Sequence, residues 1–235
     1  MRRLPLLATV IVLGGCGGED KPLVVFAASP LSNVAKEIDQ AADVVAGGSD
    51  ELAAKIRDGA EADVFLSASK APLDELRADG TVERPIPFAS NSLVIVVPAK
   101  GTGNVTHIVD LTRKGVKLVL GADGVPVGDH ARESLELAGL GAALENVVGL
   151  EPDAKAIVDK VALGEADAGI VYATDFDPTG DGVRAFSISE HFQPQIPYYA
   201  AIVSPGSDAA ERYLARLFGA EGYAALQIAG LQPQR

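Results

Sequence analysis

The chain has 235 residues, of which 48% are hydrophobic and 22% charged, a composition that suits one large globular domain or two small ones. The formal net charge of −12 argues against general nucleic-acid binding, which needs basic surfaces, but it allows a small anion held by local N–H donors. A single cysteine, Cys16, excludes a disulfide framework.

The N-terminal segment has the composition of an export signal. Two arginines precede a mostly apolar run over residues 4–13, which is too short to span a membrane permanently. Small residues then lead to Cys16, and this arrangement resembles a bacterial lipoprotein lipobox. We therefore expect residues 1–15 to be a signal peptide and residues 16–21 to be a tether lipidated at Cys16. The protein would be exported to the periplasm, or its extracytoplasmic equivalent, and anchored to the outer face of the cytoplasmic membrane.

Short apolar runs alternate with amphipathic segments in the first half of the remaining chain. The apolar runs predict strands at 23–29, 43–48 and 62–69. The segments between and after them predict helices at 30–42, 49–59 and 71–80, the second with Ser49 as its N-cap. Continuous apolar strands that alternate with helices indicate an α/β fold with a parallel sheet covered on both faces.

A long strand is expected at 91–103, and the alternation then begins again. It predicts a short helix at 110–115, a strand at 116–122, helices at 128–140 and 153–166, a strand at 167–176, a second long strand at 196–207, and closing helices at 207–219 and 221–230.

Two α/β units separated by two long strands indicate two doubly wound lobes joined by a two-stranded hinge. We expect the chain to enter the second lobe near Val97 and to return near Ile202. Lobe one would then comprise residues 22–97 and 203–235, and lobe two residues 98–202. A cleft between two lobes is a favoured place for a ligand.

Enzymatic chemistry finds little support in the sequence. A Ser29 hydrolase would need a histidine partner, yet His107, His130 and His191 stand in no motif and Gly-x-Ser-x-Gly is absent. We interpret the three histidines as surface or loop residues. No site for a bare metal cation is predicted. Tyr198-Tyr199 could hold ferric iron only if both faced the cleft, whereas neighbours in a strand point to opposite faces.

Four strand-to-helix or loop-to-helix junctions favour anion binding instead. Ser29 and Ser49 begin two helical segments in the first unit, and Pro126-Val127-Gly128 and Asp153-Ala154 begin two in the second. Such junctions offer free backbone N–H groups at the positive end of a helix dipole, and in α/β sheets they gather where ligands bind. Each junction alone could equally be an ordinary helix start. Their combination in both units favours a binding function.

Several stretches together resemble the periplasmic molybdate-binding proteins of molybdate ABC transporters, a family of two-lobed solute-binding proteins. The resemblance extends in order from residue 22 to about residue 230. The stretches are VFAASPLSNVA (25–35), SDELAAKI (49–56), GAEADVFLSA (59–68), NSLV (91–94), VPVG (125–128), GIVY (169–172) and YYAAIV (198–203).

The resemblance implies a ligand site made only of hydrogen-bond donors. Ser29 and Ser49 would donate through hydroxyl and backbone N–H groups, Val127 and Ala154 through backbone N–H groups, and Tyr172 through its hydroxyl.

Two residues depart from the family pattern. Pro30 follows the first serine, although proline fits the first turn of a helix. Asp50 places a carboxylate beside the site, and we expect it to face solvent at the start of its helix.

A site made only of donors suits a tetrahedral oxyanion without a proton, such as molybdate, tungstate or sulfate. Hydrogen phosphate would leave its own O–H unpaired, at a cost of ~1–3 kcal/mol. The resemblance implies a monomer that binds molybdate or tungstate, needs no cofactor and passes the ligand to an inner-membrane ABC permease. The alternatives are a binder of sulfate, phosphate or ferric iron, or an enzyme that uses Ser29.

Overall fold

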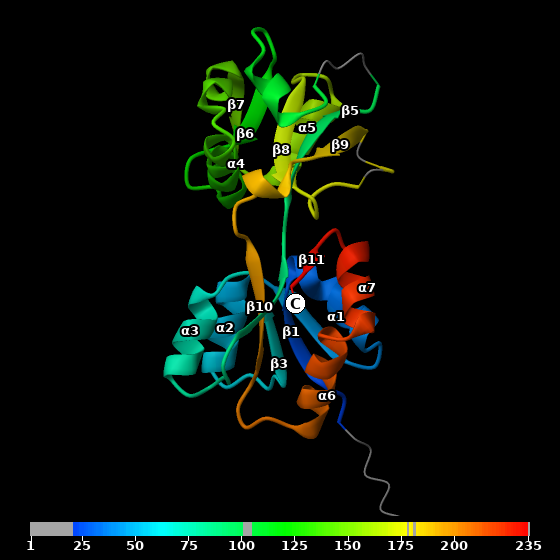
Figure 1. Cartoon of the computed structure of the whole chain (residues 1–235). Coiled ribbons are helices and arrows are strands. Elements are labelled where there is room, and N and C mark those ends of the chain that lie inside the picture. The colour runs from blue at the N-terminus through cyan, green and yellow to red at the C-terminus, as the bar shows by residue number, and fades with distance from the viewer. Residues whose placement is uncertain (1–20, 101–104, 178, 181, 235) are drawn as a thin grey trace, which may run out of the picture.

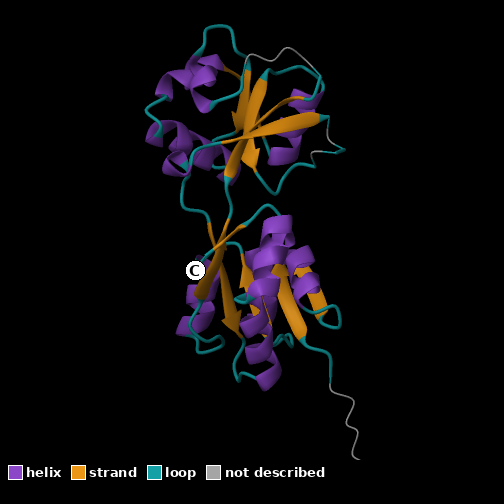
Figure 2. Cartoon of the chain, turned by 45° about the vertical axis from the view of Figure 1, so that its right-hand side comes forward, coloured by secondary structure: helices purple, strands orange, loops and turns teal. Residues whose placement is uncertain are grey.

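The computed structural model describes residues 21–234 except 101–104, 178 and 181. The chain forms two lobes, each built around one β-sheet with helices packed on it (Figures 1 and 2). The prediction of two doubly wound α/β lobes joined by a two-stranded hinge is confirmed for the two α/β lobes. Both sheets are mixed and not purely parallel, because β10 (Pro197–Ile202) in one sheet and β5 (Leu93–Pro98) in the other run antiparallel to their neighbours.

Lobe one contains a six-stranded sheet in the order β11-β4-β10-β3-β1-β2. Strands β1, β2 and β3 run parallel to one another, and β10 runs antiparallel to β3 and to β4. The strands are β1 (Val24–Ala28), β2 (Asp43–Gly47), β3 (Val64–Ser67), β4 (Ile86–Ser90), β10 (Pro197–Ile202) and β11 (Gln232–Pro233).

Helices cover both faces of this sheet. Successive side chains of a strand point to opposite faces, so a strand of continuous apolar residues has two apolar faces to bury. Phe26 packs with the apolar side chains of α2 and α3, whereas its neighbours Val25 and Ala27 belong to the cluster formed with α1, α6 and α7. The helices are α1 (Ser32–Ile38), α2 (Ser49–Arg57), α3 (Ala71–Ala78), α6 (Asp208–Leu217) and α7 (Ala220–Ile228), and a 3-10 turn (Ser29–Leu31) leads into α1.

Lobe two contains a five-stranded sheet in the order β7-β6-β8-β5-β9. The strands are β5 (Leu93–Pro98), β6 (Leu118–Gly121), β7 (Val147–Glu151), β8 (Ala168–Tyr172) and β9 (Val183–Ser187). Helices α4 (Pro126–Leu137) and α5 (Ala154–Ala162) pack on it, with 3-10 turns at Ile108–Thr112, Gly141–Asn146 and Glu190–Phe192. None of the helices in the described ranges is long and apolar enough to cross a bilayer.

The strand pairing corrects the predicted crossing points. The crossings predicted near Val97 and Ile202 are wrong, because β5 pairs only within the second sheet and β10 only within the first. The chain therefore enters lobe two at residues 91–92, between β4 and β5, and returns through residues 188–196, before β10. The error arose because both strands are long and apolar, and nothing in either sequence says which sheet it joins.

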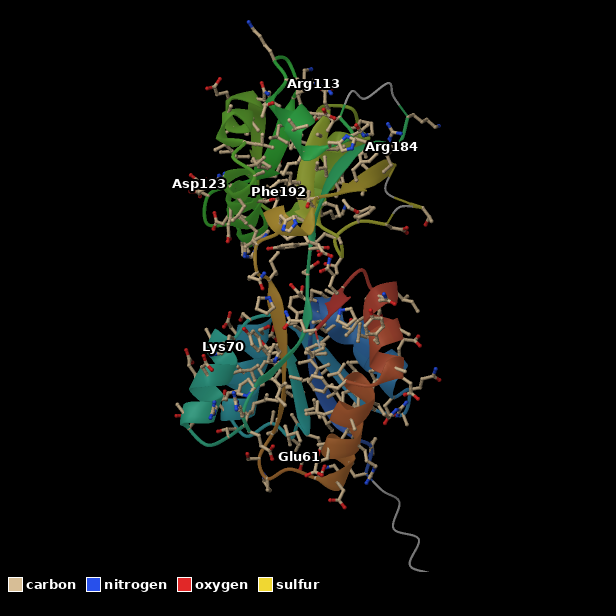
Figure 3. The ribbon with its side chains drawn as sticks, in the orientation of Figure 1. Glu61, Lys70, Arg113, Asp123, Arg184 and Phe192 are labelled. Carbon is tan, nitrogen blue, oxygen red and sulfur yellow. The ribbon has the colours of Figure 1, made fainter. Side chains whose placement is uncertain are left out.

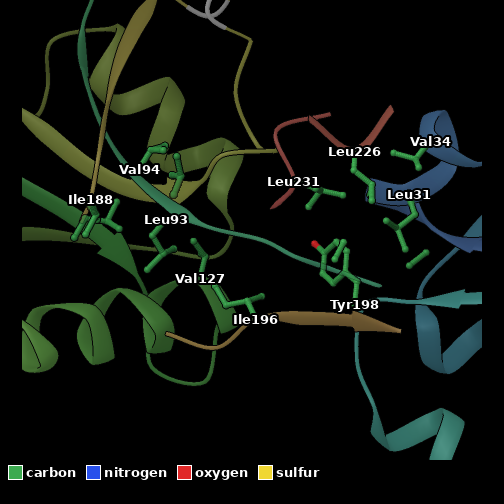
Figure 4. Close-up of a cluster of buried hydrophobic side chains, with 14 of the residues drawn as sticks. Leu31, Val34, Leu93, Val94, Val127, Ile188, Ile196, Tyr198, Leu226 and Leu231 are labelled. Atoms are coloured by element: carbon green, nitrogen blue, oxygen red, sulfur yellow. The ribbon is translucent and has the colours of Figure 1, made fainter. Parts of the chain in front are cut away.

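The larger hydrophobic cluster continues from one lobe through the crossings into the other. Figure 4 shows Leu31 and Val34 of lobe one, Tyr198 and Ile196 at the return crossing, and Leu93 and Val127 of lobe two in one close-up. The lobes are thus joined by packed apolar side chains as well as by two chain segments.

The topology turns one edge of each sheet toward the crossings. In lobe one, β10 enters from the crossing and pairs Tyr199 with Ser67, the last residue of β3, so the carboxyl ends of the parallel strands lie on the hinge side. In lobe two, Leu93 follows the first crossing directly and pairs with Tyr172, the last residue of β8. The carboxyl edges of both sheets therefore face the connection between the lobes.

Candidate anion-binding site

In lobe one the two candidate serines follow neighbouring parallel strands. The register pairs Ala28, the last residue of β1, with Gly47, the last residue of β2. Ser29 begins the 3-10 turn after β1, and its Oγ donates a hydrogen bond of 3.3 Å to the Gly47 carbonyl. The two junctions therefore lie side by side at the carboxyl edge of the sheet.

The prediction that Ser49 is the N-cap of α2 is wrong. Gly48 occupies the N-cap position, and Ser49 is the first residue of the helix. Its Oγ accepts a hydrogen bond of 3.0 Å from the backbone N–H of Ala68. A hydroxyl that accepts through its oxygen keeps its own hydrogen for another acceptor. Ser49 thus presents a positioned hydroxyl donor at this edge.

The two departures from the family pattern are accommodated at this edge. Pro30 lies in the first turn after β1, where a missing N–H removes no intrahelical hydrogen bond. Asp50 is exposed in the first turn of α2, where the helix dipole favours a carboxylate.

In lobe two Val127 is the second residue of α4, so its N–H has no intrahelical acceptor. Its side chain is 3% exposed and joins the large apolar cluster (Figure 4). The start of α4 lies against the end of β6: a Cβ added to Gly128 would be 2.2 Å from the carbonyl oxygen of Gly121. Glycine at both positions is what lets the helix start approach the strand end this closely.

Ala154 is the first residue of α5, which begins three residues after the end of β7 at Glu151. The preceding Asp153 is the N-cap, and its carboxylate accepts a 2.8 Å hydrogen bond from the N–H of Ala156. Gly121 of β6 pairs with Glu151 of β7, so the starts of α4 and α5 follow neighbouring strand ends. The N–H of Ala154 has no intrahelical acceptor at this position.

Tyr172 ends β8 and its hydroxyl oxygen lies 2.7 Å from Nδ1 of His130 on α4. Burial, together with the nearby Asp175 carboxylate, raises the pKa of Tyr172 far above its ordinary value, so the phenol keeps its hydrogen at neutral pH. The prediction that His130 is a surface or loop residue is wrong, because His130 is half-buried in α4 and contacts Tyr172. The sequence held no signal of the contact, because it depends on how α4 packs against β6 and β8.

Sequence reasoning also missed the polar side chains that join the two crossings. Asn91, 3% exposed, donates from Nδ2 to Thr174 Oγ1 at 2.9 Å and to Tyr198 Oη at 3.0 Å. Gln193 accepts from the N–H of Leu93 at 2.8 Å and donates to the same residue's carbonyl at 2.9 Å. Each side chain joins one crossing to the strand beside the other, Asn91 to Tyr198 near the start of β10 and Gln193 to Leu93 at the start of β5.

Asp175 lies in the turn after β8, close to this polar junction. Its backbone N–H donates to the carbonyl of Tyr172 at 3.0 Å. Burial raises the pKa of the Asp175 carboxyl to about 6, opposed by the hydroxyl of Thr174 at 3.5 Å. A carboxyl with a pKa of about 6 therefore lies close to the first crossing, since its neighbour Thr174 accepts a hydrogen bond from Asn91.

Of the charged residues labelled in Figure 3, Glu61 and Arg113 lie at the ends of the two lobes far from the crossings. The side chains of Asp123 and Glu61 are 88% and 76% exposed. The five candidate donors carry no formal charge, so they can receive an anion although the whole chain is acidic. Within the described ranges, no three or more His, Cys, Asp or Glu side chains are grouped so that they could share a metal ion.

The paired tyrosines point away from each other, as expected for neighbours in a strand. Tyr198 belongs to the large apolar cluster, and Tyr199 packs against the smaller cluster on the other face of the sheet. This separation removes the arrangement that the ferric-iron alternative required.

The structure thus distributes the five candidate residues over two facing edges. Ser29 and Ser49 lie at the edge of lobe one, and Val127, Ala154 and Tyr172 lie at the edge of lobe two. The side-chain hydrogen bonds described for Ser29, Ser49 and Tyr172 each stay within one lobe. Cys16, the expected lipidation site, lies outside the described residues.

Two α/β lobes joined by a double crossing, with the carboxyl ends of their parallel strands facing it, have the architecture of a bilobal solute-binding protein. The chain belongs to the family described as bacterial extracellular solute-binding protein, whose profile matches residues 26–232.

Three known proteins illustrate the relationship. The molybdate-binding protein ModA of Mycobacterium tuberculosis is 33% identical over 165 residues, which span 66% of this chain and 62% of the relative. ModA of Escherichia coli is 28% identical over 216 residues, 84% of this chain and 83% of the relative. The solved substrate-binding domain assigned to a molybdenum ABC transporter of Clostridium difficile superposes with a TM-score of 0.79 at 25% identity, covering 91% of this chain and 99% of that domain.

Proposed function

We propose that this protein binds molybdate, and also tungstate, between its two lobes and delivers the anion to an ABC permease for import. Ser29 and Ser49 donate from lobe one, and Val127, Ala154 and Tyr172 donate from lobe two. The protein performs no catalysis and needs no cofactor. The relatives named as molybdate-binding proteins support the choice of ligand.

One observation carries the proposal: the candidate groups at both hinge-facing edges are uncharged donors. Ser49 keeps a free hydroxyl hydrogen, and the first-turn N–H groups of α4 and α5 lack intrahelical acceptors. A dianionic oxyanion accepts hydrogen bonds at every oxygen and donates none. Hydrogen phosphate would have to bury an O–H among donors, which disfavours it by ~1–3 kcal/mol.

Calorimetric titration of the purified protein with molybdate, tungstate, sulfate and phosphate tests the proposal. Strong binding of molybdate and tungstate, with weak or absent binding of phosphate, is the expected result. The absence of heat with molybdate would show that the assignment is wrong, and tight binding of sulfate alone would assign the site to that anion.

We further propose that the protein is exported, cleaved before Cys16 and anchored through a lipid on that cysteine, and that it acts as a monomer. The apolar N-terminal run and the small residues before Cys16 support export and lipidation. Mass spectrometry of the protein from membranes should find a diacylglyceryl-modified Cys16 as the first residue. A mature chain that starts elsewhere, without lipid, contradicts this.

A further inference from the structure

His130 and Tyr172 form a contact between α4 and the end of β8, and what we infer from it rests on the proposed function. His130 lies in the second turn of α4 and Tyr172 at the end of β8, and both side chains are half-buried. The tyrosine hydroxyl and His130 Nδ1 are 2.7 Å apart, and the two rings meet edge to face with centroids 5.8 Å apart. The contact is therefore short and held in a defined orientation.

The hydroxyl of Tyr172 has one hydrogen, and that hydrogen can serve only one acceptor well. If Nδ1 of His130 carries no hydrogen, the imidazole accepts and the tyrosine hydrogen points at the histidine. If Nδ1 carries a hydrogen, the imidazole donates to the phenol oxygen, and the tyrosine hydrogen is free to turn elsewhere. The position of one proton on His130 thus decides whether Tyr172 can donate to a ligand.

An oxyanion bound at the proposed site can accept the Tyr172 hydrogen only in the second arrangement. Because Tyr172 stays neutral, it has a hydrogen to give, but the first arrangement commits that hydrogen to the imidazole. We infer that oxyanion binding selects the form of His130 with a hydrogen on Nδ1, and that His130 is a positioning residue that aims the Tyr172 hydroxyl at the anion. His130 acts through Tyr172 and touches no ligand itself.

Nitrogen-15 NMR of the protein labelled at histidine reads the hydrogen on Nδ1 directly. On addition of molybdate, the Nδ1 resonance of His130 is expected to move to, or to remain at, the position of a nitrogen that carries a hydrogen. The signal is assigned by its loss in His130→Gln, and the exposed His107 and His191 provide internal references. A saturated complex in which Nδ1 of His130 carries no hydrogen overturns the inference.

A double-mutant cycle tests whether His130 acts through Tyr172. His130→Leu should weaken molybdate binding roughly fivefold, the effect of one ordinary hydrogen bond, and Tyr172→Phe should weaken it more. In the Tyr172→Phe background, His130→Leu should have no further effect. His130→Gln, whose amide can donate to the phenol oxygen, should retain most of the affinity, and His191→Gln serves as the matched control.

The results of these experiments distinguish a failure of the proposed function from a failure of the role assigned to His130. If the unmodified protein binds no molybdate, the proposed function fails before the variants are compared. If it binds molybdate but His130→Leu costs the same affinity with and without the Tyr172 hydroxyl, the function stands and the role of His130 is wrong. Melting temperatures of all variants show whether a loss of affinity comes from a loss of folded protein.

Discussion

The two serines of lobe one differ in what their hydroxyl hydrogens do before a ligand arrives. Ser49 accepts from Ala68 and keeps its hydrogen free, whereas Ser29 directs its hydrogen to the carbonyl of Gly47 at 3.3 Å. A ligand that uses the Ser29 hydroxyl must therefore replace an existing hydrogen bond. The two side chains should not contribute equally to binding.

Ser49→Ala is accordingly expected to weaken molybdate binding by about tenfold or more, as expected for a hydrogen bond to a charged acceptor. Ser29→Ala should cost less, about fivefold or below, because only the net gain over the bond to Gly47 is lost. Calorimetric titration measures both. Ser207→Ala, which removes the N-cap of α6, should lower stability without changing affinity. Equal losses for the two serines would contradict this reading of their hydroxyls.

The buried carboxyl of Asp175 predicts that the stability of the folded protein depends on pH. Its carboxyl holds a proton more strongly in the folded protein, with a pKa of about 6, than its ordinary value of 3.8 allows in the unfolded chain. The stability that this group contributes is therefore present below about pH 4 and is lost as pH rises through about 6. Asp175→Asn should raise the melting temperature relative to the unmodified protein increasingly between these two pH values.

Asp177 provides a control of opposite sign. Hydrogen bonds from the Thr179 hydroxyl and N–H lower the pKa of the Asp177 carboxyl. Its contribution is thus present above the ordinary pKa and lost as pH falls through the lowered one. Asp177→Asn should lower the relative melting temperature at neutral pH and lose that effect in acid. For Asp175, the prediction is wrong if the difference in melting temperature between Asp175→Asn and the unmodified protein stays constant between about pH 4 and about pH 6.

At the scale of elements, the starts of α4 and α5 supply backbone donors that no side-chain substitution removes. Proline at the first position of a helix does remove the N–H, and it fits there because its φ angle is helical. At α5 the preceding residue, Asp153, is extended, which is the conformation that a following proline requires.

Ala154→Pro should therefore leave the helix intact and weaken molybdate binding about tenfold, because one donor to a charged ligand is lost. Ala220→Pro makes the same change at the first position of α7, where Gly219 is also extended and no ligand is proposed. Circular dichroism checks the helices and titration gives the affinity. If both variants bind molybdate like the unmodified protein, Ala154 has no part in the site.

The close approach of α4 to β6 is also open to test. In Gly128→Ala the new Cβ would lie 2.2 Å from the backbone oxygen of Gly121, and neither backbone can rotate away as a side chain could. We expect a loss of about 2 kcal/mol or more in the free energy of unfolding, with weaker anion binding as the helix start is displaced. Gly141→Ala, which meets nothing within 4 Å, should be nearly neutral in chemical denaturation.

The elements also show how far the sequence alone could lead. The buried strands β1, β3 and β6 and the long helices were predicted because continuous apolar runs and helical spacing are local signals. Four strands in the described chain were missed: β4, β7, β9 and β11. β4 contains Pro87, which is unfavourable in a strand. β7 is an edge strand in which exposed residues alternate with partly buried ones, so it lacks the continuous apolar run used to predict the other strands. Their strand conformation comes from pairing with partners distant in the sequence.

The same limit applies to the candidate site. The helix starts are visible in the sequence, and the family resemblance selected Ser29, Ser49, Val127 and Ala154 among them. These residues are then found at the edges that face the crossings. Their ligand role stays a prediction. His130 and Asn91 could not be proposed, because their importance lies in contacts with residues 42 and 107 positions away.

At the scale of the whole molecule, the two crossings determine how the lobes can move. Asn91 and Gln193 each join one crossing to the strand that lies beside the other crossing, so bending is expected to occur in both segments together. Donors on opposite lobes can surround one anion only if the lobes approach. Small-angle X-ray scattering should therefore show a smaller radius of gyration with saturating molybdate than without it. An equal concentration of phosphate is the control, and an unchanged radius at full molybdate occupancy would argue against closure.

The strand order of lobe one also has a consequence for how the protein is made. β10 lies between β3 and β4, yet it follows all of lobe two in the chain. A nascent chain that emerges from its N-terminus can complete the second sheet once Ser187 is out, while the first sheet still lacks an inner strand. Until residue 202 appears, β3 and β4 have unpaired edges of the kind that attract other strands. The lobe that begins the chain is thus the last to be finished, and the period of greatest exposure to misassembly falls between the synthesis of β4 and that of β10.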